Sequence, residues 1–359
     1  MSMGYQGYAK IVPPTGTPIL LLATGASVNL VLEPIYSSAV WGAGWYNAAT
    51  TTHYADGALR YEGNIDIDMQ ATTDFWNTVK DWAIDWRAYS KSLDISPDGV
   101  KIYRFTSNQT QGDPTSFDNS GAWATSLSFS TSEGSFVTSS IGIVGLSRTF
   151  ADTGQDGYVA NRTGVTTAAE MDATFPLNPS SLNISPIPFW RTNAQFLYDA
   201  GGTYPGPFGA GSPPQTGLEC VEWSVELGNN QVVLYTCDGT REATAVLMGA
   251  IDVTSSVTLY HPQTVFDPIL GGSASHGIVG TGTEENPFLT AQKTRFLVEI
   301  ITGVATSVHV ELPAIVVESD DYGLKGQSDV TNRGFSMKGL GGRTYGGEIL
   351  PPMMMETAV

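Results

Sequence analysis

Short segments of this chain recur at one spacing of about 186 positions, and this recurrence constrains the possible fold more than any other feature. Residues 63–67 (GNIDI) recur as residues 249–253 (GAIDV), and residues 32–33 (LE) recur as residues 218–219. A chain that carries two copies of one module can occupy two equivalent places in a symmetric assembly. The matching segments are short, so coincidence is the alternative to a duplication.

The composition predicts a mainly β protein with two domains. The 359 residues include 40 Gly and 20 Pro, which divide the chain into the short segments typical of all-β architectures. A chain of this length corresponds to about two domains. Prolines cluster at residues 176–188, and we place the domain boundary at about 180–188. We expect an N-terminal extended arm at 1–30, a first domain at 31–185, a second domain at 186–318 and a C-terminal arm at 319–359.

The clearest predicted strand covers residues 59–69, where apolar and polar side chains alternate. Ile65 and Ile67 lie on its apolar face. Because successive side chains of a strand point to opposite faces, one face is expected to be buried and the other to face water. The polar face carries Glu62, Asp66 and Asp68.

The second half of the chain repeats this alternation. Residues 220–227 form a predicted strand that exposes Glu222 and Glu226, and a strand region over residues 243–260 exposes Asp252. The two cysteines are too few for a disulfide framework, and we expect both to be free thiols.

An amphipathic helix is predicted over residues 73–87, with Thr73 as its cap. Its apolar residues are spaced four, three and four positions apart, which places them on one stripe that packs against the core. The corresponding segment of the second half, residues 261–272, is a weaker helix candidate that contains two prolines. The stripe consists of Phe75, Val79, Trp82 and Trp86.

The charge balance argues against tight binding to nucleic acids or to anionic membranes. The chain has 35 Asp and Glu against 17 Lys and Arg, for a net charge of −18. Such a surface repels DNA. It is compatible with a protein that DNA must pass without adhering, and solubility alone is the alternative reason for the charge.

No pattern of catalytic, cofactor-binding or metal-binding residues occurs in the sequence, and we expect no enzyme activity. The four histidines are scattered without metal-ligand spacing. No apolar segment reaches the length of a transmembrane helix, so no membrane partner is expected. Three tryptophans in or beside predicted loops keep a carbohydrate-binding surface open as an alternative; they are Trp41, Trp45 and Trp123.

The order of strand, acidic alternating strand, amphipathic helix and further strands resembles the tail tube (major tail) proteins of long-tailed bacteriophages. The resemblance rests on residues 58–69 with the helix 74–86, and on residues 221–260 with the segment 261–272. It implies two tandem tail-tube-like domains of the β-sandwich or barrel type, each with one packed α-helix. In that family six tube domains form each ring around a channel, and members that fuse two domains form trimeric rings.

The resemblance implies a structural virion protein that is made in the host cytoplasm and located in the virion tail. Chains would assemble with themselves into trimeric rings of pseudo-sixfold symmetry, and the rings would stack through the two arms and contact other tail proteins. Double-stranded DNA would pass through the channel without sequence-specific contacts. The alternative is a carbohydrate-binding or adhesion β-sandwich, or another virion structural protein such as a capsid decoration protein. The candidate channel-lining residues are Glu62, Asp66, Asp68, Glu222, Glu226 and Asp252.

Overall fold

The structure is a computed structural model, and it confirms that the protein is mainly β. The residues that it describes are 8–12, 19–21, 23–37, 53–55, 57–70, 72–84, 90–96, 103–107, 121–146, 148–150, 186–198, 204, 206–208, 220–237, 241, 243–260, 294–303, 306–322 and 332–358.

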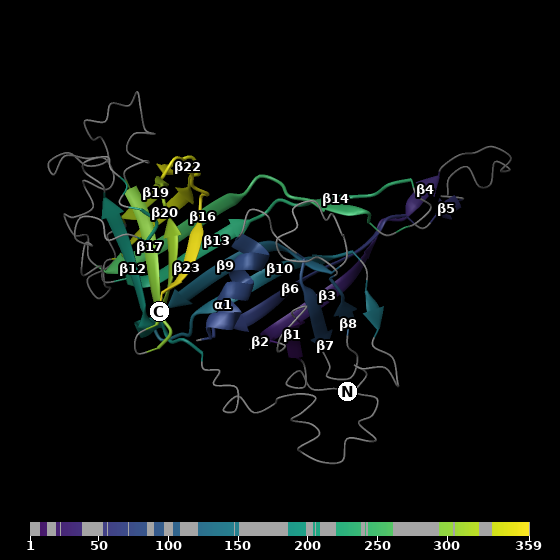
Figure 1. Ribbon diagram of the computed structural model, residues 1–359, viewed down its shortest axis with the longest axis horizontal. Helices are drawn as coiled ribbons and strands as arrows, with labels where there is room; N and C mark the ends of the chain where they lie inside the picture. The colour runs from purple at the N-terminus through teal and green to yellow at the C-terminus, as the bar shows by residue number, and fades with distance from the viewer. Residues whose placement is uncertain are drawn as a thin grey trace, which may run out of the picture.

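One long sheet of eight antiparallel strands runs through the molecule (Figure 1). Its strand order is β19-β20-β16-β13-β9-β10-β6-β3. The bounds, in chain order, are β3 Ala23–Leu32, β6 Leu59–Asp68, β9 Ala122–Ser132, β10 Thr138–Gly145, β13 Cys220–Gly228, β16 Asp252–Tyr260, β19 Ile315–Tyr322 and β20 Asn332–Gly339.

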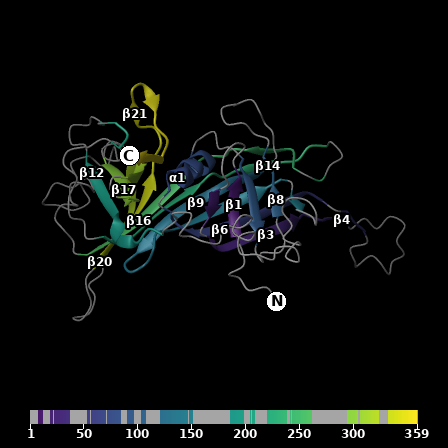
Figure 2. The same ribbon diagram turned by 60° about the horizontal axis from the view of Figure 1, so that its bottom comes forward.

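Two smaller sheets and a helix cover one face of the long sheet (Figures 1 and 2). The first has the order β11-β8-β7-β1-β2, and the second has the order β12-β17-β18-β23. Their bounds are β1 Tyr8–Val12, β2 Ile19–Leu21, β7 Ser92–Ser96, β8 Tyr103–Phe105, β11 Thr149–Phe150, β12 Thr192–Tyr198, β17 Thr294–Ile301, β18 Ser307–Leu312 and β23 Met354–Ala358.

Three two-stranded hairpins complete the β structure. The hairpin β4–β5 leads away from the sheets at one end of the molecule, and β14 lies at the same end (Figure 1). A 3-10 turn, η5 (Phe189–Arg191), precedes β12. The hairpin strands are β4 Ile35–Ser37 with β5 His53–Ala55, β14 Val232–Leu234 with β15 Ala245–Leu247, and β21 Thr344–Tyr345 with β22 Glu348–Ile349.

The predicted aromatic helix is present, with two differences from expectation. It consists of α1 (Thr73–Val79) followed by a π-helical segment, η3 (Lys80–Ile84). Thr73 is not the cap, because the helix begins there and Thr72 precedes it without a side-chain capping bond. Trp86 and the helix candidate at 261–272 lie outside the described residues. The rest of the stripe is buried, as predicted; its members are Phe75, Val79 and Trp82.

The helix is fixed to the long sheet by two buried tryptophans. Trp76, which the predicted stripe omitted, packs against Phe129 of β9 with ring centroids 5.9 Å apart. The Trp82 indole donates a hydrogen bond of 3.0 Å to the Ala122 carbonyl at the start of β9. A buried indole usually finds such a partner, since an unpaired N–H in the core is costly.

The long sheet consists of two halves with the same strand order. The first runs β3-β6-β10-β9 and the second runs β13-β16-β20-β19. The smaller sheets repeat as well, because β1-β7-β8-β11 in one matches β12-β17-β18-β23 in the other. The pairing of β9 with β13 joins the halves. The hydrogen-bonded sheet is therefore continuous across the boundary that was expected at 185/186.

β-Bulges lie at corresponding places in the two halves. The register between β3 and β6 shifts between Ala23 and Gly25, and the register between β13 and β16 shifts between Cys220 and Glu222. A bulge inserts one extra residue into one strand of a pair. In the β9–β10 and β19–β20 pairs, the extra residues are Thr125 and Glu318.

These bulges show that the spacing of 186 positions does not match equivalent residues. When the bulge residues are aligned and the cross-strand register is followed from them, each strand of the first half has a counterpart at a fixed sequence spacing. The spacing is 197 positions from β3 to β13, 192 from β6 to β16, 193 from β9 to β19 and 194 from β10 to β20. The expected match of Ile65 with Ile251 is wrong, because Ile251 precedes β16 whereas Ile65 lies in the middle of β6. The register instead matches Ile65 with Val257, and both are buried.

The expected terminal arms are wrong for the described residues, because strands from both expected arms belong to the sheets. Ala9 and Ile11 of β1 are fully buried, and β1 pairs with both β2 and β7. At the other end, β23 pairs with β18, and Met353 and Met355 are buried. The apolar residues at the ends alternate with polar ones over only a few positions, and the surrounding Gly and Pro hid this pattern.

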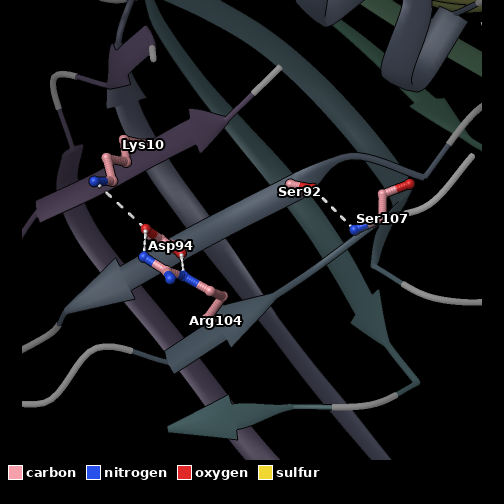
Figure 3. A network of polar contacts seen from close by, with 5 residues as sticks. All are labelled: Lys10, Ser92, Asp94, Arg104 and Ser107. Carbon is pink, nitrogen blue, oxygen red and sulfur yellow. Dashed lines mark hydrogen bonds and ion pairs between the residues drawn. The ribbon is translucent and has the colours of Figure 1, made fainter. Parts of the chain in front are cut away.

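Each smaller sheet carries an ion pair on two neighbouring strands. In the first, the buried carboxylate of Asp94 accepts two hydrogen bonds from Arg104 and lies 3.4 Å from Lys10 Nζ (Figure 3). In the second, Arg295 on β17 donates to Glu311 on β18 at 3.1 Å, and both side chains are fully buried. The carboxylate lies on β7 in the first sheet and on β18 in the second, whereas β7 matches β17, so acid and base are exchanged between matching strands.

Truncation of Trp82 tests the core. Trp82→Ala should lower the free energy of unfolding by about 3–5 kcal/mol, because it removes a fully buried ring and one hydrogen bond. Urea denaturation followed by circular dichroism measures the change. Asn77→Ala, on the exposed side of the same helix, is the matched control and should be close to neutral. A loss below about 1 kcal/mol for Trp82→Ala would contradict this packing.

Candidate channel-lining face

All six acidic residues singled out in the sequence lie on one face of the long sheet, opposite the core. Cross-strand neighbours share a face, so the register links the two halves directly. Asp66 and Glu226 belong to the same row across the sheet, although 160 positions separate them in the sequence. That row runs Gly25, Asp66, Ser140, Ser128, Glu226, Thr254, Lys338 and Val316.

Small hydroxyl side chains fill the middle of this face. Alternate residues of β9 are serines. Ser128 faces Ser140 of β10, and Ser130 lies between Thr138 of β10 and Ser224 of β13. The Ser140 hydroxyl donates to Asp66 at 2.6 Å, and the hydroxyls of Ser224 and Ser256 lie 2.7 Å apart. The middle of the face is therefore polar and rich in hydroxyl groups, with carboxylates on both sides of it.

The two basic side chains described on this face are both paired with carboxylates. Arg60 donates to Glu62 and to Glu33, and the hydrogen bond to Glu62 is the main reason that the pKa of Arg60 is raised. Lys338 lies 2.9 Å from Asp252, and its hydrogen bond to that carboxylate raises the lysine pKa. The pairs neutralise Glu62 and Asp252 in part. Negative charge is left mainly at Asp66, Asp68, Glu222 and Glu226.

One end of the polar face is covered by the β14–β15 hairpin. Val246 of β15 and Ala243 form a separate hydrophobic cluster with Trp123, Val144 and Leu146, and Val233 of β14 packs against it. The backbone of the connecting segment also reaches β6, where the Leu59 N–H donates to the Arg241 carbonyl at 3.0 Å. Trp123 is therefore a buried contact between the halves and not an exposed sugar platform; Trp41 and Trp45 lie outside the described residues.

The long sheet ends in two strands that have a hydrogen-bonded neighbour on one side only within the described chain, β3 and β19. An unpaired edge presents a row of N–H and C=O groups to another strand. Leu30 and Leu32 of β3 are 43 % and 48 % exposed. Neither leucine was singled out in the sequence, because an edge strand has the same pattern as a central one.

The described residues provide neither a metal-binding cluster nor a membrane-spanning helix. That part of the chain contains no group of three or more His, Cys, Asp or Glu side chains placed to hold a metal ion. No helix within it is long and apolar enough to cross a membrane. Cys220 and Cys237 are free thiols, as expected, and burial raises the pKa of Cys220 to about 12.

Comparison with known proteins adds no assignment, since no protein-family model and no curated protein matches the chain.

Asp68 should make the stability of the protein depend on pH. Partial burial raises the Asp68 pKa above its ordinary value of 3.8, so the folded state binds this proton more tightly than the unfolded chain does. The ionised carboxylate therefore costs stability as the pH rises through the folded pKa. Asp68→Asn should raise the free energy of unfolding at neutral pH, and the gain should vanish below about pH 3.

Urea denaturation at a series of pH values measures this difference. Glu222→Gln is the control, because it removes one carboxylate from the same face at an exposed position. Equal effects of the two substitutions would mean that general charge repulsion, and not burial of Asp68, sets the pH dependence.

Proposed function

We propose that this protein is the tube-forming subunit of a bacteriophage tail. It carries two tandem copies of one tail-tube-like module, and three chains close into a ring of pseudo-sixfold symmetry. Stacked rings form a channel through which double-stranded DNA leaves the capsid. The protein has a structural role and no catalytic one, it belongs to the virion tail, and its other partners are further tail proteins.

The matching order of strands supports a duplication. Both halves of the long sheet, both smaller sheets and both pairs of bulges correspond strand by strand. A chance likeness of topology would not place the extra residues Thr125 and Glu318 at corresponding positions of matching strands. The duplication rests on this hydrogen-bonding pattern, since few side chains agree between the halves.

The exposure of the β3 edge is the observation that most directly supports the proposed ring. In the junction between the halves, Leu227 and Asn229 are each 1 % exposed, because β9 pairs with β13 there. Their counterparts on β3, at the spacing of 197, are Leu30 and Leu32, which are 43 % and 48 % exposed. Pairing of β3 with β19 of a neighbouring copy repeats the internal junction and buries both leucines.

The size of the resulting barrel suits a channel. Three copies of the eight-stranded sheet supply 24 strands. Strands spaced about 4.8 Å apart then give a backbone diameter of about 37 Å if upright and about 48 Å at a tilt of roughly 40°. Barrels of about 16–18 strands already enclose an aqueous channel, so a ring of this size has an open lumen.

The polar face fits the lining of such a channel. It is the face opposite the core, so it is the one that remains free when the smaller sheets surround the barrel. Its carboxylates repel the DNA phosphates, and its serine-rich centre offers no cationic anchor. DNA can then slide along the wall without adhering. Among the six candidates, Glu222 and Glu226 are exposed and make no ion pair within the described residues.

Purified protein should form rings, and substitution at the β3 edge should abolish them. Light scattering of the wild type should give three times the chain mass of 38.2 kDa, or tubes at high concentration. Leu30→Glu should leave the chain folded and monomeric, because the new charge would be buried at the junction without a partner. Negative-stain electron microscopy should show separate particles for this variant.

Ile301→Glu is the control for the edge variant. It places the same charge at a similarly exposed aliphatic position on β17, which belongs to the second smaller sheet and not to the long sheet, and should leave ring formation intact. A wild type that stays monomeric at high concentration would overturn the ring and favour a β-sandwich that binds carbohydrate or decorates a capsid.

Tubes should retain DNA only when acidic residues of the polar face are replaced by basic ones. Glu222→Lys with Glu226→Lys should leave the tubes intact and make them bind duplex DNA at low salt, because six added cations per ring face the phosphates. That binding should weaken steeply as salt rises. Electrophoretic mobility and co-sedimentation of DNA with wild-type and variant tubes measure the difference. Equal retention by the two would mean that these residues do not line the DNA path.

A further inference from the structure

The junction between the two halves is held by more than strand pairing. The β14–β15 hairpin of the second half lies across the polar face of the first half. There it buries Trp123, Val144 and Leu146, which are 6 %, 2 % and 2 % exposed. Val233 and Val246 are paired across the hairpin and lie in this contact. The hairpin therefore acts as a clamp over the β9–β13 junction.

The first half has a hairpin at the corresponding place in the chain. β4–β5 connects β3 to β6, as β14–β15 connects β13 to β16. The spacing of 197 that aligns β3 with β13 also aligns β4 with β14, and the spacing of 192 that aligns β6 with β16 also aligns β5 with β15. They match the pair Val233–Val246 with the pair Tyr36–Tyr54, and each is a pair of directly opposite residues.

The second half also has a counterpart of the covered surface. The spacings of 193 and 194 match Trp123 with Val316 and Val144 with Lys338. The covered residues of the first half are nearly inaccessible, whereas Val316 is half-buried and the Lys338 side chain is 41 % exposed. Leu340, the counterpart of Leu146, is also half-buried. We call Val316, Lys338 and Leu340 the receptor patch.

We propose that the β4–β5 hairpin of each copy packs across the receptor patch of the neighbouring copy in the ring. This inference rests on the proposed ring, in which β3 of one copy lies beside β19 of the next. At every junction between chains, two contacts then hold a second copy of the chain in place. One is the pairing of β3 with β19, and the other is the packing of the β4–β5 hairpin on the receptor patch. The internal junction supplies the geometry, because the same two contacts occur there within one chain.

The residue sizes at the two junctions are complementary. Within the chain, small valines of the hairpin meet the large Trp123. Between chains, the matching hairpin positions carry tyrosines and the matching patch position carries a valine, so large and small residue types are exchanged and the total volume is similar. Tyrosine also suits the patch chemically, because its ring can lie over aliphatic carbon and attract the Lys338 ammonium by a cation–π contact.

Disulfide trapping tests this contact. In a chain with Cys220→Ala and Cys237→Ser, the substitutions Tyr54→Cys and Val316→Cys should cross-link neighbouring copies on oxidation. A non-reducing gel should show bands of two and three chains and none larger. The matched control carries Val246→Cys with Trp123→Cys, the corresponding pair of the internal junction, and should cross-link without a change in chain mass.

The outcomes separate the clamp from the ring. A monomer by light scattering and no intermolecular cross-link would overturn the proposed function, and the inference with it. Rings without a cross-link, in a preparation whose internal control does cross-link, would overturn the clamp alone. Bands beyond three chains would also overturn it, because the hairpin would then reach a different ring.

A second measurement uses the unaltered chain, in case the cysteine variants do not fold. Hydrogen–deuterium exchange of dilute wild-type monomer and of assembled rings should show slower exchange after assembly in peptides that cover β4–β5 and residues 338–340. Peptides from β14–β15 should exchange equally in both samples, because that clamp is already closed within the chain. Unchanged exchange at β4–β5 would overturn the proposal.

Discussion

The pairing of β9 with β13 is the contact on which the rest of this structure depends. It joins two four-stranded halves into one sheet and places their polar faces in a common surface. The helix is tied to the same place, since the Asn229 side-chain amide donates to the Ala83 carbonyl at 3.1 Å and to the Ala124 carbonyl at 2.9 Å. A buried amide that binds two carbonyls fixes the helix and the junction in one arrangement.

The two halves match in backbone topology and differ in side chains. Asp66 corresponds to Thr258, and Arg60 corresponds to Asp252. The acidic face of the long sheet is therefore assembled from both halves at non-equivalent positions. Backbone pairing constrains strand order and bulges through hydrogen bonds that any residue can make, whereas an exposed polar position accepts many side chains. This is why the duplication is visible in the register and only faintly visible in the sequence.

Features set by local periodicity could be predicted from the sequence. The alternation in β6 and β13 identified the buried and polar faces, and the spacing of Phe75, Val79 and Trp82 identified the helix face. Features set by distant pairing could not be predicted. β15 was expected to belong to one strand region over residues 243–260, and the burial of Trp123 depends on a hairpin more than 100 positions away. The core strand at Ala9 and Ile11 was missed because five residues carry too little periodic signal.

The exposed edge of β3 has a consequence for the life of the chain before assembly. Natural edge strands are usually protected by charge, proline or a covering loop, and Leu30 and Leu32 offer no such protection. A free chain therefore carries an adhesive strand from the moment it folds, and it is exposed to wrong partners in proportion to the time it spends alone. In the proposed ring a neighbouring copy covers this edge, so the persistence of the folded chain becomes a function of subunit concentration.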